Sequence, residues 1–194
     1  MPTSEHEGDD QRRARCRIER LGQFVLGDGE PVALLQRRLD PLEHLVHALL
    51  QALVLVHERV ADQHARIERK KLRIERQIAP DLNLLGEAFL LRQALGNLLE
   101  NALDFSPSHG VLRLSAQRQG AQIEFSLFNQ AEPIPDYALA RLSERFYSLP
   151  RPDSGRKSTG LGLNFVEEVL QLHGGSLQIG NVAGGVEVTL RLPA

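Results

Sequence analysis

Apolar residues recur every three or four positions in three stretches of the chain, which is the spacing of one buried helical face. The first stretch covers residues 41 to about 70, the second residues 89–105, and the third residues 161 to about 172. The second and third run into the glycine-containing segments 106–110 and 173–175, which are typical of helix ends. The pattern predicts three helices.

Five shorter stretches are typical of β-strands. Residues 72–78 alternate apolar and polar side chains, which is the period of a half-buried strand. Residues 111–114 and 123–128 predict a hairpin joined through Gln119-Gly120, and residues 176–179 and 186–192 predict two further strands. These elements predict a two-layer α/β sandwich, in which a five-stranded mixed sheet carries three helices on one face.

The N-terminal part lacks this regularity. Residues 1–10 are polar, and residues 11–26 predict a short, weak helix. The glycines and proline at 27–31 then interrupt any periodic pattern. We therefore expect a polar tail and linker at residues 1–29, followed by one domain at residues 30–194.

Composition and charge narrow the function classes. The 194 residues include 25 acidic and 23 basic ones, so the chain lacks the positive footprint of a nucleic-acid-binding protein. The single cysteine, Cys16, cannot form an internal disulfide, and this favours the cytoplasm. The longest apolar run, residues 45–56, is too short for the roughly 20 residues of a spanning helix, and the acidic start is unlike a secretory signal.

A basic cluster lies around the end of the first predicted helix. Glu68 and Glu75 offset its positive charges. Charge runs are usually solvated faces, so we interpret this cluster as surface. Its members are Arg66, Arg69, Lys70, Lys71, Arg73 and Arg76.

Two segments have the composition of a phosphate site. Asn97 and Asn101 are four residues apart, so their amides lie one turn apart on one helix face, where they can meet a shared ligand. Residues 158–163, Ser-Thr-Gly-Leu-Gly-Leu, open the third helix. Glycines there let the backbone approach an anion, while free amides and the helix dipole face it.

With Ala102, Phe105 and Ser106, the two asparagines resemble the N-box of the Bergerat-fold (GHKL) ATP-binding family, which includes histidine kinases, type II topoisomerases and Hsp90. Gly160 and Gly162 resemble its second glycine box, residues 142–148 its F-box, and residues 149–157 its lid over ATP. The strings at 93–105 and 134–163 together look like a sensor histidine kinase of the CreC type.

The resemblance implies that the domain binds ATP and magnesium. Asn101 would hold the magnesium through its amide oxygen, a hard ligand, and Arg156 and Lys157 would reach phosphate oxygens. No side chain is assigned to the chemical step itself. The nucleotide-binding residues implied are Asn97, Asn101, Asp104, Phe105, Asn129, Ile134, Tyr147, Arg156, Lys157, Ser158, Thr159, Gly160, Leu161, Gly162 and Leu163.

Position 97 favours the histidine-kinase branch. In the family that this chain resembles, the ATP-hydrolysing members and the anti-sigma kinases carry a glutamate at this position, and it can act as a base. The amide of Asn97 cannot accept a proton in that way. We therefore expect slow hydrolysis and transfer of the γ-phosphoryl group to a histidine on a separate dimerisation domain. His57-Glu58 lacks the proline of the family's acceptor motif, so we expect that domain to be absent here. The resemblance makes residues 1–29 a candidate remnant of its dimerisation helix. By resemblance, the parent would be a dimer anchored in the inner membrane, and it would pass phosphate to a response regulator.

The first glycine box departs from the family's Asp-x-Gly-x-Gly-Ile, because the chain has Asn-Gln-Ala-Glu-Pro-Ile at 129–134. Asn129 can accept from the adenine amine only without charge, and Ala131 and Pro133 cannot take the positive φ angles of glycine. Asp104 stands where many members have a basic residue and would repel phosphates. Two alternatives therefore stay open: a non-catalytic regulatory domain with a degraded nucleotide site, and a free-standing regulator of the anti-sigma kind.

Overall fold

The structure is a computed structural model that describes residues 50–194, except 52–59, 61–62, 81 and 85. Several predictions fall outside the described residues. They are the helix at 11–26, the boundary between residues 29 and 30, and most of the helix predicted from residue 41.

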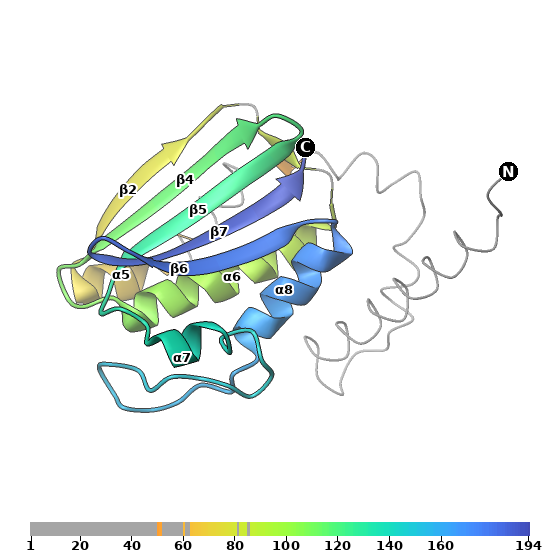
Figure 1. The fold of residues 1–194 in the computed structure, drawn as a ribbon. Coiled ribbons are helices and arrows are strands. Elements are labelled where there is room, and N and C mark those ends of the chain that lie inside the picture. The colour runs from red at the N-terminus through yellow and green to blue at the C-terminus, as the bar shows by residue number, and fades with distance from the viewer. Residues whose placement is uncertain (1–49, 52–59, 61–62, 81, 85) are drawn as a thin grey trace, which may run out of the picture. The chain divides into compact units, whose positions relative to one another are not determined.

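A five-stranded sheet forms one layer of the domain. In spatial order it consists of β2 (Arg73–Ile78), β4 (Val111–Gln119), β5 (Gln122–Gln130), β7 (Gly185–Pro193) and β6 (Ser176–Val182). β2 runs parallel to β4, and the other neighbours pair antiparallel. The sheet is therefore mixed, as predicted, with β5 at its centre (Figure 1).

The central strand shows why the alternation in the sequence produces a half-buried sheet. Ile123, Phe125 and Leu127 are buried and two residues apart, so their side chains lie on one face. Asn129 continues the same series and is also buried. The hairpin turn between β4 and β5 contains Gly120 with φ +62°, a backbone conformation that glycine adopts without a Cβ clash.

Three helices, α5 (His64–Lys70), α6 (Ala88–Phe105) and α8 (Gly162–Leu172), cover one face of this sheet (Figure 1). α6 and α8 bury the apolar stripes that predicted them. The buried residues are Leu90, Leu91, Ala94, Leu98, Leu99, Ala102 and Leu103 on α6, and Phe165, Val166, Val169 and Leu170 on α8.

His173 joins the start of α6 to the end of α8. Its Nε2 accepts from the backbone N–H of Glu87 at 2.9 Å, so its Nδ1 carries the proton and donates to the carbonyl of Val169 at 2.7 Å. The Glu87 carboxylate in turn caps α6 by accepting from the Leu90 N–H at 2.8 Å. The two helices that carry the candidate site are thus fixed to each other at the ends away from it.

The predicted two-layer sandwich is confirmed; β4, β5, β6 and β7 are longer than predicted, and β2 is one residue shorter. Elements of two to four residues were not predicted, because they are too short to show a period. These are the antiparallel pair β1 (Leu50–Gln51) and β3 (Asn83–Leu84), and α7 (Asp136–Leu139). In the described part of the chain, no helix combines the length and the apolar composition needed to cross a membrane.

Candidate functional site

A pocket of about 120 Å³ opens between α6, the helix-covered face of the sheet and the loop from residue 146 to residue 160, which we call the lid loop. Leu98, Asn101, Ala102 and Phe105 of α6 form one side. The opposite side, here called the sheet wall, consists of Leu127, Asn129, Ile179, Val186 and Val188. Tyr147, Ser148, Leu149, Arg151, Ser158 and Gly160 line it from the lid loop.

The structure brings many of the residues expected from the sequence to this pocket. They are Asn101, Phe105, Asn129, Ile134, Tyr147, Ser158, Gly160, Gly162 and Leu163. The others, Asn97, Asp104, Arg156, Lys157, Thr159 and Leu161, do not line it. Arg156 and Lys157 are exposed on the lid loop.

The two segments with the composition of a phosphate site meet directly. The Asn97 amide Nδ2 lies 3.5 Å from the carbonyl oxygen of Gly162 and donates to it. A Cβ added at Gly162 would lie 3.8 Å from the Asn97 Cγ, so the first turn of α8 packs against α6. Asn101 lies one helical turn further along α6 and reaches the pocket. The amide pair and the glycine-rich helix start therefore belong to one site.

The two ends of the lid loop are held together by one backbone bond and one side-chain bond within the loop. The Phe146 N–H donates to the Gly160 carbonyl at 3.0 Å, and the Ser148 hydroxyl donates to the Ser158 carbonyl at 3.0 Å. Gly160 has φ +70°, and a Cβ there would lie 2.5 Å from the Phe146 carbonyl carbon. Glycine is therefore required at this crossing for both conformation and space.

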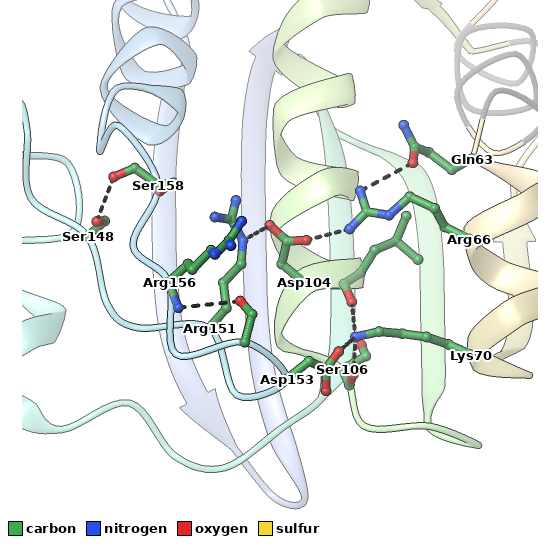
Figure 2. A network of polar contacts seen from close by, with 12 residues as sticks. Gln63, Arg66, Lys70, Asp104, Ser106, Ser148, Arg151, Asp153, Arg156 and Ser158 are labelled. Atoms are coloured by element: carbon green, nitrogen blue, oxygen red, sulfur yellow. Dashed lines mark hydrogen bonds and ion pairs between the residues drawn. The ribbon is translucent and has the colours of Figure 1, made fainter.

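Asp104 lies between two arginines (Figure 2). Its Oδ1 contacts Arg66 of α5 and its Oδ2 contacts Arg151 of the lid loop. The side chain is 12% exposed, and two cations offset its charge. The expectation that Asp104 repels phosphates stays a prediction, but the two arginines reduce the negative charge that a phosphate would meet.

Lys70 makes a second link between α5, α6 and the lid loop (Figure 2). Its Nζ donates to the carbonyls of Leu103 at 2.7 Å and Ser106 at 2.8 Å, and it pairs with Asp153 at 2.6 Å. The Lys70 side chain is only 11% exposed. The prediction that the whole basic cluster is a solvated surface is thus wrong for Lys70, whose ammonium satisfies carbonyls at the end of α6.

Asn129 places a polar group in the otherwise apolar sheet wall. The residue is 5% exposed, and its Nδ2 has no hydrogen-bond partner among the described residues. Its backbone lies in register with Leu112 and Val186, so the strand ladders fix its position. Asn129 lines the pocket, and a buried polar side chain without a protein partner is a candidate for a hydrogen bond to a ligand.

The loop that follows Asn129 is anchored by a residue that sequence analysis missed. Asn181 of β6 accepts from the Ile134 N–H at 2.8 Å and donates to the Ile134 carbonyl at 2.8 Å. This pair of bonds holds the segment that contains Ala131 and Pro133 beside the pocket. Asn181 is 47 residues away in sequence from its partner, and no local signal marks it.

Among the described residues, no group of three or more His, Cys, Asp or Glu side chains could hold a metal ion. A magnesium ion bound with a nucleotide needs few protein ligands, because phosphates and waters complete its octahedron. Asn101 fits that role, because it lines the pocket and its amide oxygen is a hard ligand.

Comparison with known proteins gives the class to which this fold and pocket belong. Residues 86–194 match the family described as histidine kinase-, DNA gyrase B- and HSP90-like ATPase, and the chain belongs to this family.

Within it, the chain is 40% identical over 161 residues to the sensor protein CreC of Escherichia coli (strain K12). The match covers 82% of this chain and 33% of that protein, so the chain spans about a third of its relative. The resemblance to CreC-type sensor kinases is thereby confirmed.

Solved structures support the fold. The catalytic domain of the histidine kinase ThkA superposes with a TM-score of 0.68 at 20% identity, covering 74% of this chain and 93% of that one. ThkA in complex with the response regulator protein TrrA gives a TM-score of 0.65 at 19% identity, covering 98% of this chain and 61% of that one.

Proposed function

We propose that this domain binds magnesium-ATP in the pocket and transfers the γ-phosphoryl group to a histidine, as the catalytic domain of a sensor histidine kinase. The observation that carries the proposal is the contact between Asn97 and Gly162, which joins the amide-bearing helix to the glycine-opened helix at one pocket. Neither segment alone is specific, but their meeting makes one site with a metal ligand and an anion-binding helix start.

The pocket offers a place for each part of the nucleotide. The apolar residues of the sheet wall suit a purine ring, and the Asn129 amide can hydrogen-bond its edge. The free amides at the start of α8 and its dipole favour the phosphates. Asn101 would hold the magnesium, which neutralises charge that develops on the phosphoryl oxygens.

The chain's own residues bind and orient rather than attack. In the transfer, the bond between the γ-phosphorus and the bridging oxygen breaks, ADP leaves, and a histidine nitrogen forms the new bond to phosphorus. Asn97 cannot act as a base on water, and its amide is engaged with Gly162. The site therefore favours transfer to a positioned histidine over hydrolysis.

The partners follow from the same proposal. The acceptor histidine would lie on a dimerisation domain, and the phosphate would pass on to a response regulator, as in the type of assembly that ThkA forms with TrrA. The domain would work in the cytoplasm as part of a dimeric, membrane-anchored parent.

Calorimetric titration with a non-hydrolysable ATP analogue tests the proposal. We expect binding that depends on magnesium, and we expect Asn101→Ala to weaken the magnesium-dependent affinity at least tenfold. Glu100→Ala is the matched control, because Glu100 is the exposed neighbour on the same helix. If the unmodified chain binds no analogue at millimolar concentration with magnesium, the proposed function is wrong.

A further inference from the structure

We propose that Arg151 is a phosphate-binding residue of this site, and that Asp104 is a positioning residue that holds the Arg151 guanidinium beside the pocket until a nucleotide replaces it. The inference rests on the proposed function and deepens it, because it assigns the phosphate contact to a lid-loop cation that the sequence did not single out. The triphosphate and Asp104 would then compete for one guanidinium.

The position of Arg151 is the first argument. It is the lid-loop cation that lines the pocket, whereas Arg156 and Lys157 are exposed and do not line it. Its contact with Asp104 uses Nε. The terminal nitrogens, which carry most of the guanidinium donors, can therefore meet an arriving phosphate first. A planar guanidinium matches phosphate as well as carboxylate, so the phosphate can then draw Arg151 away from Asp104.

The second argument is that Asp104 keeps a partner after Arg151 leaves. A buried carboxylate that loses its only cation is strongly destabilised, and Asp104 is largely buried. Its other oxygen, however, contacts Arg66 of α5 (Figure 2). Arg151 can thus transfer to a phosphate without leaving an unpaired charge behind.

Lys70, like Asp104, keeps hydrogen-bond partners if its contact with the lid loop is lost. If the lid loop moves and Asp153 separates from it, Lys70 still donates to the carbonyls of Leu103 and Ser106. Asp153 itself is more than half exposed, so water can replace its partner. On both links the groups of α5 and α6 stay satisfied, and only the lid loop loses contacts. The network therefore holds the lid loop while permitting its release.

A comparison of AMP, ADP and ATP affinities in the full chain tests the assignment of Arg151. We expect Arg151→Ala to change AMP affinity by less than about twofold and to weaken magnesium-ATP affinity at least tenfold, because only the added phosphates would reach the guanidinium. Arg156→Ala should weaken ATP binding clearly less than Arg151→Ala. The exposed Arg118→Ala controls for loss of a surface arginine.

A double-mutant cycle tests the role of Asp104. Asp104→Asn, which preserves shape, should strengthen ATP binding severalfold and leave AMP binding unchanged, because Arg151 no longer has a competing carboxylate. In the Arg151→Ala background this gain should disappear. A rise in ATP affinity that persists without Arg151 would mean that Asp104 acts by direct repulsion, and the inference would be overturned.

The nucleotide series also separates the two proposals. Equal losses of AMP and ATP affinity in Arg151→Ala would overturn the assignment of Arg151 while leaving ATP binding, and the proposed function, in place. A wild-type chain that binds neither nucleotide would remove both. A thermal unfolding midpoint close to that of the wild type, measured without nucleotide, serves as the check that each variant is folded.

Discussion

The sheet wall and the lid loop face each other across one pocket but are held in different ways. Asn129 and its apolar neighbours are positioned by backbone ladders on both sides of β5. The lid loop is positioned by a few backbone bonds at its base and by side-chain ion pairs from Asp104 and Lys70.

This difference separates the part of the site that selects a ligand from the part that responds to one. The hydrogen bonds of a backbone ladder are cooperative, so they break only when the sheet itself unfolds. An ion pair at a partly exposed position contributes little to stability and exchanges its partners readily. A purine would therefore meet a fixed surface, and phosphates would meet a surface that rearranges. Changes on the two sides should then have different consequences, and four variants test this.

Gly160→Ala should have the largest effect, because it acts where the lid loop depends on its backbone. A left-handed residue other than glycine costs about 1–2 kcal/mol, and the new Cβ would also meet the Phe146 carbonyl carbon at 2.5 Å. We expect ATP-analogue affinity to fall by about thirtyfold or more, equivalent to about 2 kcal/mol, as measured by calorimetry.

Gly155→Ala is the matched control for this prediction. Gly155 has a similar φ of +64°, but nothing lies within 4 Å of its added Cβ. It should show the cost of conformation without the clash, and hence a much smaller loss of affinity. Equal effects of the two substitutions would show that the crossing of the two lid-loop ends is not what shapes the pocket.

The contrast between the two sides also explains what the sequence could predict. The alternation of Ile123, Phe125 and Leu127 predicts a strand because each residue's environment repeats every second position. Asn97 and Asn101 were placed together because both lie on one helix. In such cases the geometry is local, and periodicity alone is enough to place the side chains.

The ion pairs of the lid loop could not be predicted from local periodicity. Asp104 meets Arg66 and Arg151, which lie 38 and 47 residues away in sequence. Nothing local distinguishes these arginines from the exposed ones around them. The charge run that contains Arg66 predicts a solvated surface, and Arg151 stands in the lid segment with no local sign of a partner. Contacts between distant segments depend on tertiary packing, and the sequence pattern carries no signal for which cation will meet which carboxylate.

Lys70→Met should have the next largest effect, and it acts on stability. The substitution removes the ammonium that satisfies the carbonyls of Leu103 and Ser106. Buried acceptors left without a donor cost about 1–3 kcal/mol, so we expect the free energy of unfolding in urea to fall by about 2 kcal/mol.

Two further variants show which contact of Lys70 causes the loss of stability. Lys71→Met changes the exposed neighbour and should stay within about 0.5 kcal/mol. Asp153→Asn removes only the exposed end of the link and should cost less than about 1 kcal/mol. If Asp153→Asn destabilises the chain as much as Lys70→Met, the ion pair rather than the helix-end carbonyls explains the burial of Lys70.

Asn129→Asp changes the sheet wall, and it should raise ATP affinity, by a smaller factor than that by which Gly160→Ala lowers it. A charged acceptor binds the adenine amine more tightly than a neutral one by about 1 kcal/mol, so ATP affinity should rise about fivefold. An aspartate cannot donate to the 6-oxo group of guanine, so the preference for ATP over GTP should rise by more than that factor. Unchanged affinity for both nucleotides would show that Asn129 does not contact the base.

Asn181→Ala should have the smallest effect, because it removes two side-chain bonds from a short loop that directly follows the backbone-held strand β5. Both bonds to Ile134 are exposed, and each contributes about 0.5–1 kcal/mol at most. We expect ATP affinity to fall about twofold to threefold, and Asn181→Asp, which keeps the acceptor for the Ile134 N–H, to lose less. A loss as large as that of Gly160→Ala would mean that the loop after Asn129 depends on removable side-chain contacts as the lid loop does. The pocket would then have two rearranging sides, and the sheet wall alone could not fix the position of the base.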